Sequence, residues 1–151
     1  MMVDELIHRG GTELTELAQS ELTGKILGAA FEVHTALGPG LLESVYQQAL
    51  ERELHLQGLP FSAQVQVPLQ YKGGTLDTSL RLDLLVAEQV IVEIKSIATL
   101  DDIHHAQLLT YLRLTDLQVG LLINFNVVSL KLGIKRVINT PRTSANSVPP
   151  R

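Results

Sequence analysis

Several features are missing from this sequence of 151 residues, and each absence excludes a class of structure or function. The chain contains no cysteine, so disulfide bonds and thiolate metal sites are excluded, and any metal would be bound by oxygen or imidazole groups. Such ligands favour Mg²⁺ or Mn²⁺ over structural zinc. No apolar run approaches the ~20 residues of a membrane span, and the N-terminus lacks a signal-peptide pattern. We therefore expect a cytoplasmic protein with no membrane partner.

Acidic residues are also missing from the C-terminal part of the chain. The formal net charge is −4, yet no Asp or Glu follows Leu117. The basic residues in that part are Lys131, Lys135, Arg136, Arg142 and Arg151. Two interpretations stay open, a basic face that meets phosphate groups and a solvated surface with a loose tail.

What is present indicates one folded unit. Hydrophobic residues make up 45% of the chain and charged residues 19%, which is ordinary for a globular domain. We expect a weakly ordered N-terminal arm over residues 1–22, with a short helix from Thr12. A folded domain follows over residues 23–139. Proline, serine and threonine then predict a disordered tail over residues 140–151.

The stretch of residues 81–95 is central to the prediction. Two short runs rich in Val, Ile and Leu flank the tripeptide Ala-Glu-Gln, which predicts a β-hairpin. In the predicted register Asp83 lies opposite Glu93, and Arg81 lies opposite Lys95. Alternation along the strands then gathers these four charged residues on one face. The other face is apolar and consists of Leu82, Leu84, Val92 and Ile94.

Two carboxylates directly opposite each other on a sheet repel, so they need a cation, a shared proton or a salt bridge. One interpretation is a divalent metal ion held by Asp83 and Glu93, with Lys95 beside it. The other is a salt-bridged square that includes Arg81 and Lys95. The spacing alone does not decide between them.

Two helices precede the hairpin. The first is predicted from about Thr23 to Leu37 and the second from about Leu42 to Gln57, with glycine and proline after each. Glu43 lies in the first turn of the second helix, where the helix dipole favours a carboxylate. The alternative is that Glu43 reaches over the sheet as a third acid. The predicted buried face of the second helix consists of Leu42, Val45, Tyr46, Ala49, Leu50 and Leu54.

Further strands surround the hairpin. Residues 64–71 alternate as a half-exposed strand, and Pro68 indicates that this strand lies at a sheet edge. After a turn, the chain returns into the hairpin. The apolar run of residues 119–125 predicts a strand buried on both faces, and residues 135–138 a last strand.

A helix over residues 102–115, capped by Asp101, connects the hairpin to the buried strand. His104, Gln107 and Tyr111 share one face of this helix. A hydrogen bond in the core would explain each of them singly, whereas three aligned polar groups suggest a site. The whole order predicts an α/β protein, of the α+β type, with helices on the faces of a mixed sheet.

Several blocks of the sequence resemble one known family. Residues 40–46 (GLLESVY) fit the GxxExxY signature of a family of small bacterial proteins. Asp83, nine further residues and then residues 93–95 (EIK) resemble the D…ExK core of the PD-(D/E)XK nuclease superfamily. The usual proline before the aspartate is replaced by Leu82. Two later blocks, residues 104–111 and 120–126, are also similar to the GxxExxY pattern, so the resemblance covers roughly residues 23–139.

The resemblance implies a restriction-endonuclease-like fold, an αβββαβ core with an extra N-terminal helix. It implies that Asp83, Glu93 and the main-chain carbonyl of Ile94 bind Mg²⁺ or Mn²⁺. Lys95 would orient the attacking water or stabilise the charge that develops on phosphorus. Glu43 matches a helix acid that reaches the metal, often through water.

The resemblance also implies a set of supporting residues and a substrate. Gln107 would hold a phosphate oxygen or steady Lys95, with His104 and Tyr111 as supports. The reaction would be hydrolysis of phosphodiester bonds in nucleic acid, with DNA preferred over RNA. Cutting both strands of a duplex would favour a homodimer of so small a protein.

A rival function belongs to another class, a nuclease-like fold that binds nucleic acid or a protein partner without cutting. The small body, the lack of a separate recognition domain and the acidic net charge favour this rival. The presence of Glu43, Asp83, Glu93 and Lys95 together opposes it, and hydrolysis is therefore the preferred hypothesis.

Overall fold

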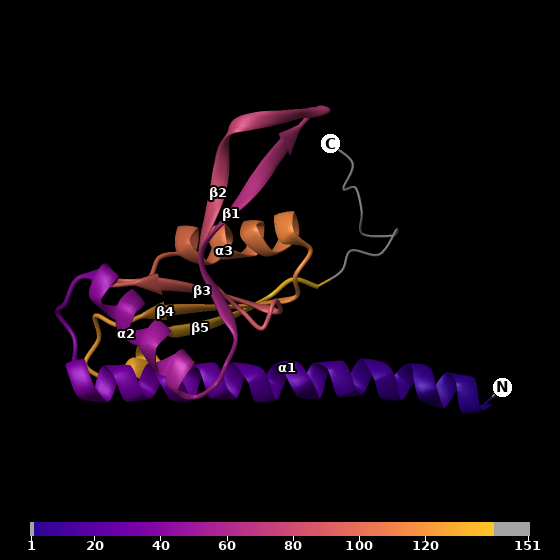
Figure 1. The fold of residues 1–151 in the computed structure, drawn as a ribbon, viewed down its shortest axis with the longest axis horizontal. Coiled ribbons are helices and arrows are strands. Elements are labelled where there is room, and N and C mark those ends of the chain that lie inside the picture. The colour runs from indigo at the N-terminus through magenta and orange to yellow at the C-terminus, as the bar shows by residue number, and fades with distance from the viewer. Residues whose placement is uncertain (1, 141–151) are drawn as a thin grey trace.

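The computed structural model describes residues 2–140, with side chains described from Glu16 onward. The elements in chain order are α1 (Met2–Leu37), α2 (Glu43–Leu56), β1 (Phe61–Tyr71), β2 (Gly74–Val86), β3 (Val90–Lys95), α3 (Asp102–Thr115), β4 (Val119–Asn124), the 3-10 helix η1 (Leu130–Gly133) and β5 (Ile134–Ile138) (Figure 1). This order confirms the predicted αβββαβ core with an additional N-terminal helix, and β5 is the predicted last strand. Of the tail predicted over residues 140–151, all but the first residue lies outside the described residues.

The five strands form one mixed sheet in the order β1-β2-β3-β4-β5. All neighbours are antiparallel except β3 and β4, which are parallel and are joined by the crossover helix α3. Every residue of β4 is buried, as expected of an inner strand covered on both faces. β1 lies at the edge, where Pro68 does not interrupt the interior of the sheet.

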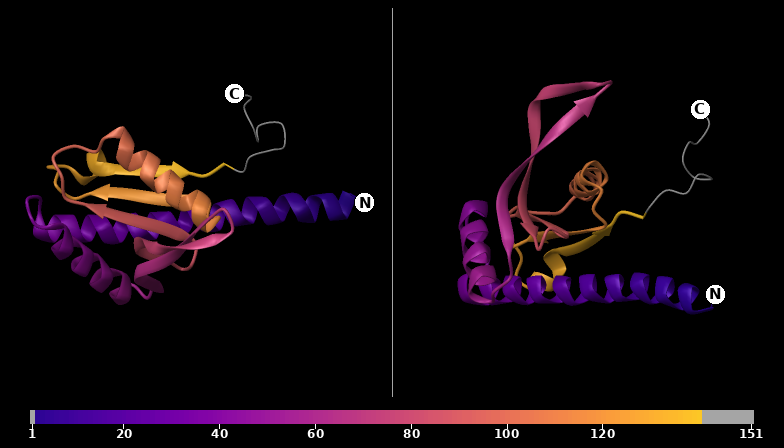
Figure 2. Two further views of the ribbon diagram at one scale, coloured as in Figure 1. Left: turned by 90° about the horizontal axis from the view of Figure 1, so that it is seen from above. Right: turned by 45° about the vertical axis from the view of Figure 1, so that its right-hand side comes forward.

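The helices cover the sheet on both faces (Figures 1 and 2). Side chains of α1 and α2 pack with one face in the larger apolar cluster, which includes Ile26, Ala30, Tyr46, Leu50, Leu54, Leu84, Val92, Ile94, Leu121 and Phe125. α3 packs on the other face in a smaller cluster of Leu80, Leu82, Ile91, Leu108, Leu112, Leu122 and Val137. Because the sheet separates two cores, each inner strand contributes side chains to both.

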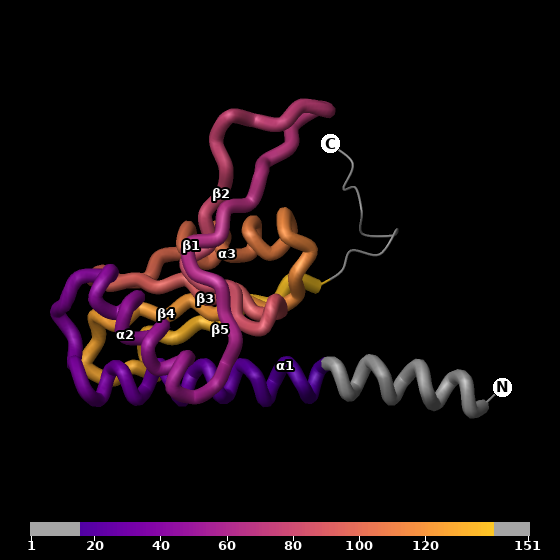
Figure 3. The backbone as a smooth tube through the Cα atoms, viewed as in Figure 1, coloured from indigo at the N-terminus to yellow at the C-terminus, as the bar shows by residue number. Residues whose placement is uncertain are grey.

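The far ends of β1 and β2 form a two-stranded arm that projects past α3 (Figure 3). Its turn is reached through residues with positive φ, Lys72 at 47° and Gly73 at 82°. Tyr71 at the tip is 62% exposed, and the Lys72 ammonium lies 5.4 Å from the centre of its ring. The arm begins near Asp83, where β2 leaves its pairing with β3.

Two predictions about the first helices are wrong. The predicted start of the first helix at Thr23 is wrong because α1 is continuous from Met2. The Thr23 hydroxyl donates a hydrogen bond to the Ser20 carbonyl, and Leu22 packs against the core, so the helix passes through this boundary. On α2, Leu42 and Val45 are 74% and 36% exposed and do not belong to the buried face.

We expect Gly120→Ala to lower the free energy of unfolding by about 1–3 kcal/mol, because overpacking strains a close-packed core. A Cβ atom at residue 120 would lie 2.9 Å from a methyl carbon of Leu108, where α3 crosses β4. Gly28→Ala is the control, since no atom lies within 4 Å of its added Cβ. It should stabilise α1 by roughly 0.5–1 kcal/mol. Denaturant unfolding checks both, and equal midpoints for the two variants would contradict the close packing.

Candidate active site

The sheet splits at Asp83, and two side chains replace the backbone ladder there. The β2–β3 pairing ends at Leu84 and Val92. One step further, the main-chain amide of Asp83 donates a 2.8 Å hydrogen bond to the Glu93 carboxylate. The amide of Ile94 donates a bond of the same length to the Asp83 carboxylate. The two acidic side chains therefore lie side by side, as the hairpin register predicts.

The predicted apolar face of the hairpin is wrong in one respect. Leu84 packs in the cluster under α1 and α2, whereas Leu82 packs in the cluster under α3. The chain of β2 twists between them, and the residue opposite Asp83 on β1 is Gln64, which has a φ of 52°. Buried and exposed positions still alternate along both strands here, so the same face of the twisted β1–β2 ribbon passes from one core to the other.

Main-chain amides hold the two carboxylates in place. Glu93 is only 6% exposed, and each carboxylate accepts its hydrogen bond from the opposite strand. The positive charges of Arg81 and Lys95, the cations of the predicted square, partly offset the rise that burial causes in the pKa of Asp83. Amide donors thus position the pair, so its geometry does not depend on a salt-bridged square.

Burial makes the ionised form of both acids unfavourable. The pKa of Glu93 is raised to about 8 by burial first, and then by the charges of Asp83 and Glu43. The pKa of Asp83 is also raised by burial, against the opposing effects of the Ile94 amide and the Lys95 ammonium. Glu93 therefore stays protonated near neutral pH unless a cation compensates its charge.

The C-terminal end of β3 lies between the first turns of α2 and α3 (Figures 1 and 2). Glu43 stands in the first turn of α2, where it is exposed and favoured by the helix dipole. Its charge also reaches Glu93, so the two interpretations of Glu43 are compatible. Within the described residues, no group of three His, Cys, Asp or Glu side chains lies close enough to hold one metal ion.

A cleft of about 550 Å³ opens beside Lys95, and α3 supplies its other wall. Its lining includes all three predicted polar residues of that helix, His104, Gln107 and Tyr111. Burial and the charges of Glu93 and Asp83 raise the pKa of Tyr111, so its hydroxyl lies within reach of their field. The structure therefore brings the aligned polar face of α3 to the same place as the end of the hairpin.

His104 also has a structural partner. Its Nδ1 accepts a 2.9 Å hydrogen bond from the main-chain amide of Asp101 and so stabilises the start of α3. With Nδ1 acting as an acceptor, the ring proton of neutral His104 is on Nε2. Nε2–H is thus the group that His104 can offer to an anion.

Sequence reasoning missed Gln47, which connects α2 to the split. Its Nε2 donates to the main-chain carbonyl of Asp83 at 3.1 Å and to a carboxylate oxygen of Glu51 at 3.0 Å. Gln47 follows Glu43 by one helical turn, and this spacing is the signal that places both residues on one face of α2. Through Gln47, the helix fixes the backbone of the residue that carries the first carboxylate.

Asn124 fixes the loop that follows Lys95. The side chain is 1% exposed, accepts a 3.1 Å bond from the amide of Ile97, and donates a 3.0 Å bond to the carbonyl of the same residue. These two bonds satisfy both main-chain polar groups of Ile97, as a neighbouring strand would. The loop between β3 and α3 is held in this way beside the cleft.

Tyr46, the tyrosine of the GLLESVY segment, supports the start of α2. Its hydroxyl donates a 2.5 Å hydrogen bond to the carbonyl of Gly38 and accepts a 3.1 Å bond from the amide of Leu41. Its ring stacks on Phe125, with 4.6 Å between the ring centres. Tyr46 therefore stabilises the turn that delivers Glu43 to the end of the sheet.

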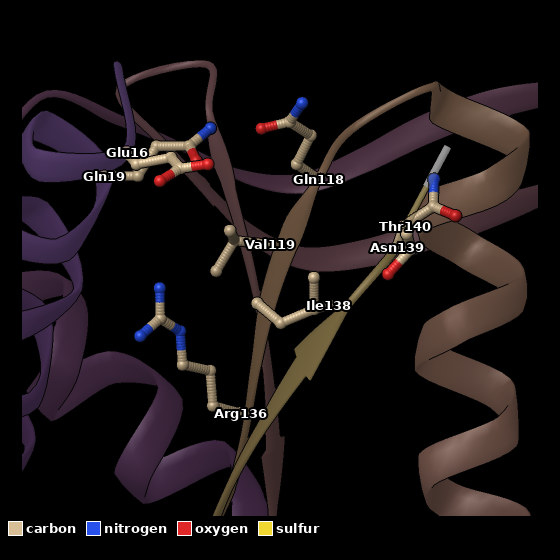
Figure 4. A pocket seen from close by; sticks show the side chains of 8 residues that line it. All are labelled: Glu16, Gln19, Gln118, Val119, Arg136, Ile138, Asn139 and Thr140. Atoms are coloured by element: carbon tan, nitrogen blue, oxygen red, sulfur yellow. The ribbon is translucent and has the colours of Figure 1, made fainter. Parts of the chain in front are cut away.

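A separate pocket of about 350 Å³ lies between α1 and the strands β4 and β5 (Figure 4). Val119 and Ile138 form its apolar part, and Arg136 points from β5 toward α1. It contains none of the predicted site residues. Arg136, one of the C-terminal basic residues, thus belongs to a different surface from the carboxylates.

The fold and the site define a class of proteins, in which a mixed sheet covered by helices carries an acidic pair and a lysine where two strands part. The family model for the PD-(D/E)XK nuclease superfamily matches residues 20–137, and the chain belongs to this superfamily. Comparisons with curated proteins and with solved structures returned no match. Among the described helices, none has both the length and the apolar character needed to cross a membrane.

We expect the stability of the metal-free protein to fall as pH rises from about 4.5 to about 8. Because the pKa of Glu93 is higher in the folded state than in the unfolded chain, the folded state binds the proton more tightly, and ionisation disfavours folding. Glu93→Gln should flatten this part of the curve of melting temperature against pH. Glu88→Gln in the exposed turn of the same hairpin should leave it unchanged. Parallel curves for Glu93→Gln and the wild type would contradict the burial effect.

Proposed function

We propose that the protein is a nuclease that hydrolyses phosphodiester bonds with Mg²⁺ or Mn²⁺ bound by Asp83 and Glu93. The observation that carries this proposal is the adjacent pair of carboxylates held by main-chain amides, whose ionised forms a divalent cation would stabilise. Lys95 lies two residues after Glu93 on β3 and lines the neighbouring cleft. Membership of the nuclease superfamily makes nucleic acid the substrate class to test.

The residues at the split fit a hard divalent ion. The side chains offer carboxylate oxygens, and Mg²⁺ is usually held by one or two carboxylates together with water and substrate phosphate. A third side-chain ligand is therefore not required, and Glu43 would act through water. The amide of Ile94 faces Asp83, and the carbonyl of a strand residue points to the same edge as its amide, which supports the Ile94 carbonyl as a further ligand.

When bound, such an ion stabilises negative charge on the phosphate and lowers the pKa of a neighbouring water molecule. Lys95 would stabilise the charge that develops on the phosphoryl oxygens, since its ammonium lies close enough to lower the pKa of both acids. Gln107 would hold a phosphate oxygen from α3, and the Nε2–H of His104 would donate to the same group. Tyr111 would support them from the following turn.

The surroundings of the cleft suit an anionic polymer. Both α2 and α3 begin beside the end of β3, and the positive ends of their dipoles favour phosphate groups. Exposed Lys131 and Lys135 would contribute more distant positive charge. We propose DNA as the first substrate and RNA as the second. A homodimer would supply the two sites needed to cut both strands of a duplex.

We expect wild-type protein to bind Mn²⁺ in calorimetry and the double variant Asp83→Asn/Glu93→Gln to bind none. Removal of two anions takes away the charged ligands, whereas the amide side chains keep the hydrogen bonds that hold the split. Asp77→Asn on the exposed arm removes a carboxylate elsewhere and should bind Mn²⁺ as the wild type does. If wild type takes up no Mn²⁺ even with DNA present, the nuclease proposal fails and a binding module remains.

We expect Lys95→Met to keep Mn²⁺ binding and to lower the rate of DNA cleavage by about 10²–10³-fold, the usual cost of losing one group that stabilises transition-state charge. Single-turnover cleavage with saturating Mn²⁺ separates this effect from metal affinity. Lys25→Met on the exposed face of α1 is the matched control and should cleave at nearly the wild-type rate. Equal cleavage by Lys95→Met and the wild type would remove Lys95 from the mechanism.

A further inference from the structure

Leu42, at the start of α2 near the candidate site, is unusual in two ways: a leucine is a poor N-cap residue, and its apolar side chain is exposed. It occupies the N-cap position of α2, where Ser, Thr, Asp or Asn would stabilise the helix, and it makes no capping hydrogen bond. It is also 74% exposed and belongs to neither apolar cluster. A residue that weakens the helix and packs against nothing is a candidate for a functional contact.

Ile103 is the counterpart of Leu42 on the other helix. It lies in the first turn of α3, is 69% exposed, and is also absent from both apolar clusters. Ile103 lines the cleft together with Lys95 and Gln107. An exposed apolar side chain thus lies directly beside the polar residues proposed to hold a phosphate.

A hydrogen bond brings the α2 side to the same place. The hydroxyl of Ser96, the residue after Lys95, donates a 2.5 Å bond to the main-chain carbonyl of Leu41. The turn that carries Leu42 is therefore attached to the end of β3, while Ile103 lines the cleft beside Lys95. Two exposed apolar residues flank the end of the strand that carries Lys95.

We propose that Leu42 and Ile103 contact the faces of unpaired nucleobases, so that the protein selects single-stranded nucleic acid at the bond to be cut. This inference rests on the proposed function and specifies its substrate. A nucleic-acid strand alternates phosphates with bases, and the site alternates in the same way: Lys95 and two helix N-termini favour the phosphate, and the apolar side chains beside them favour the base.

Base stacking makes this contact selective. In a duplex both faces of each base are covered by its neighbours, so an apolar side chain reaches them only after the stack is opened at a cost of a few kcal/mol. A single strand presents its base faces at little cost. The apolar pair therefore favours single strands, whereas the phosphate contacts alone would favour the duplex, which has the higher charge density.

The first experiment measures binding and does not depend on cleavage. A short fluorescein-labelled DNA strand, alone or annealed to its complement, is titrated with protein in Ca²⁺, and fluorescence anisotropy is recorded. We expect wild type to bind the single strand more tightly than the duplex. The variant Leu42→Ser/Ile103→Ser should weaken single-strand binding by about fivefold or more, because it removes the apolar surface that the two side chains would bury against base faces, and should leave duplex binding within about twofold.

Matched controls lie at the opposite ends of the same helices. Leu56 is the last residue of α2 and is 62% exposed, and Leu114 is in the last turn of α3 and is 52% exposed. Leu56→Ser/Leu114→Ser removes a similar apolar surface and should bind both forms as the wild type does. Because Ser is a good N-cap residue, Leu42→Ser should also melt no lower than the wild type, so lost binding is not unfolding.

The outcomes separate this inference from the proposed function. If the wild type prefers duplex, or if the double variant keeps its preference for the single strand, the role of the apolar pair is wrong, while metal-dependent cleavage still supports a nuclease. If the wild type binds neither form, both proposals fail. If single-strand preference is lost in the variant but Mn²⁺ never yields cleavage, the inference stands and the protein is a binding module.

Discussion

The whole site depends on two hydrogen bonds between main-chain amides and carboxylate side chains, which replace the backbone pairing of β2 with β3 where the two strands separate. Asp83 and Glu93 each accept an amide from the opposite strand, so the strands are held together at the point where they begin to diverge. This arrangement gathers two acids on adjacent strands and turns the rest of β2 into the projecting arm. It also frees the end of β3 to carry Lys95 to the starts of two helices. Its electrostatic cost is the burial of two carboxylates, which raises the pKa of both.

Much of this arrangement could be predicted from the sequence, because local periodicity determines it. Short β-rich runs separated by three residues specify one hairpin register, and that register alone brings Asp83 and Glu93 together. Helical spacing places His104, Gln107 and Tyr111 on one face of α3, and the cleft confirms that they share a surface. Strand order followed equally from simple cues, such as the proline at the edge and the continuous apolar run of β4.

Tertiary effects explain what the sequence did not reveal. The twist at Gln64 sends Leu82 and Leu84 to different cores, and no periodic pattern contains a positive φ in a glutamine. The helix start predicted at Thr23 falls inside α1, because Leu22 packs against the core and the helix continues through this point. The exposure of Leu42 could not be separated from burial, because a leucine at the start of a helix fits an apolar stripe. Gln47 was missed because the sequence around a single polar residue on a helix does not indicate which distant group it bonds to.

The order of the strands in the sheet follows their order in the chain, and this feature affects how the protein assembles. Each strand finds its neighbour without threading past another, so the entropy lost in closing each loop stays small. The closure between β2 and β3 is a tight turn, and it already brings the two acids together. The parallel pairing of β3 with β4 closes a longer loop, which contains α3 and hence the wall of the cleft. The acidic pair is therefore encoded in a local hairpin, and the cleft that surrounds it depends on a contact between more distant parts of the chain.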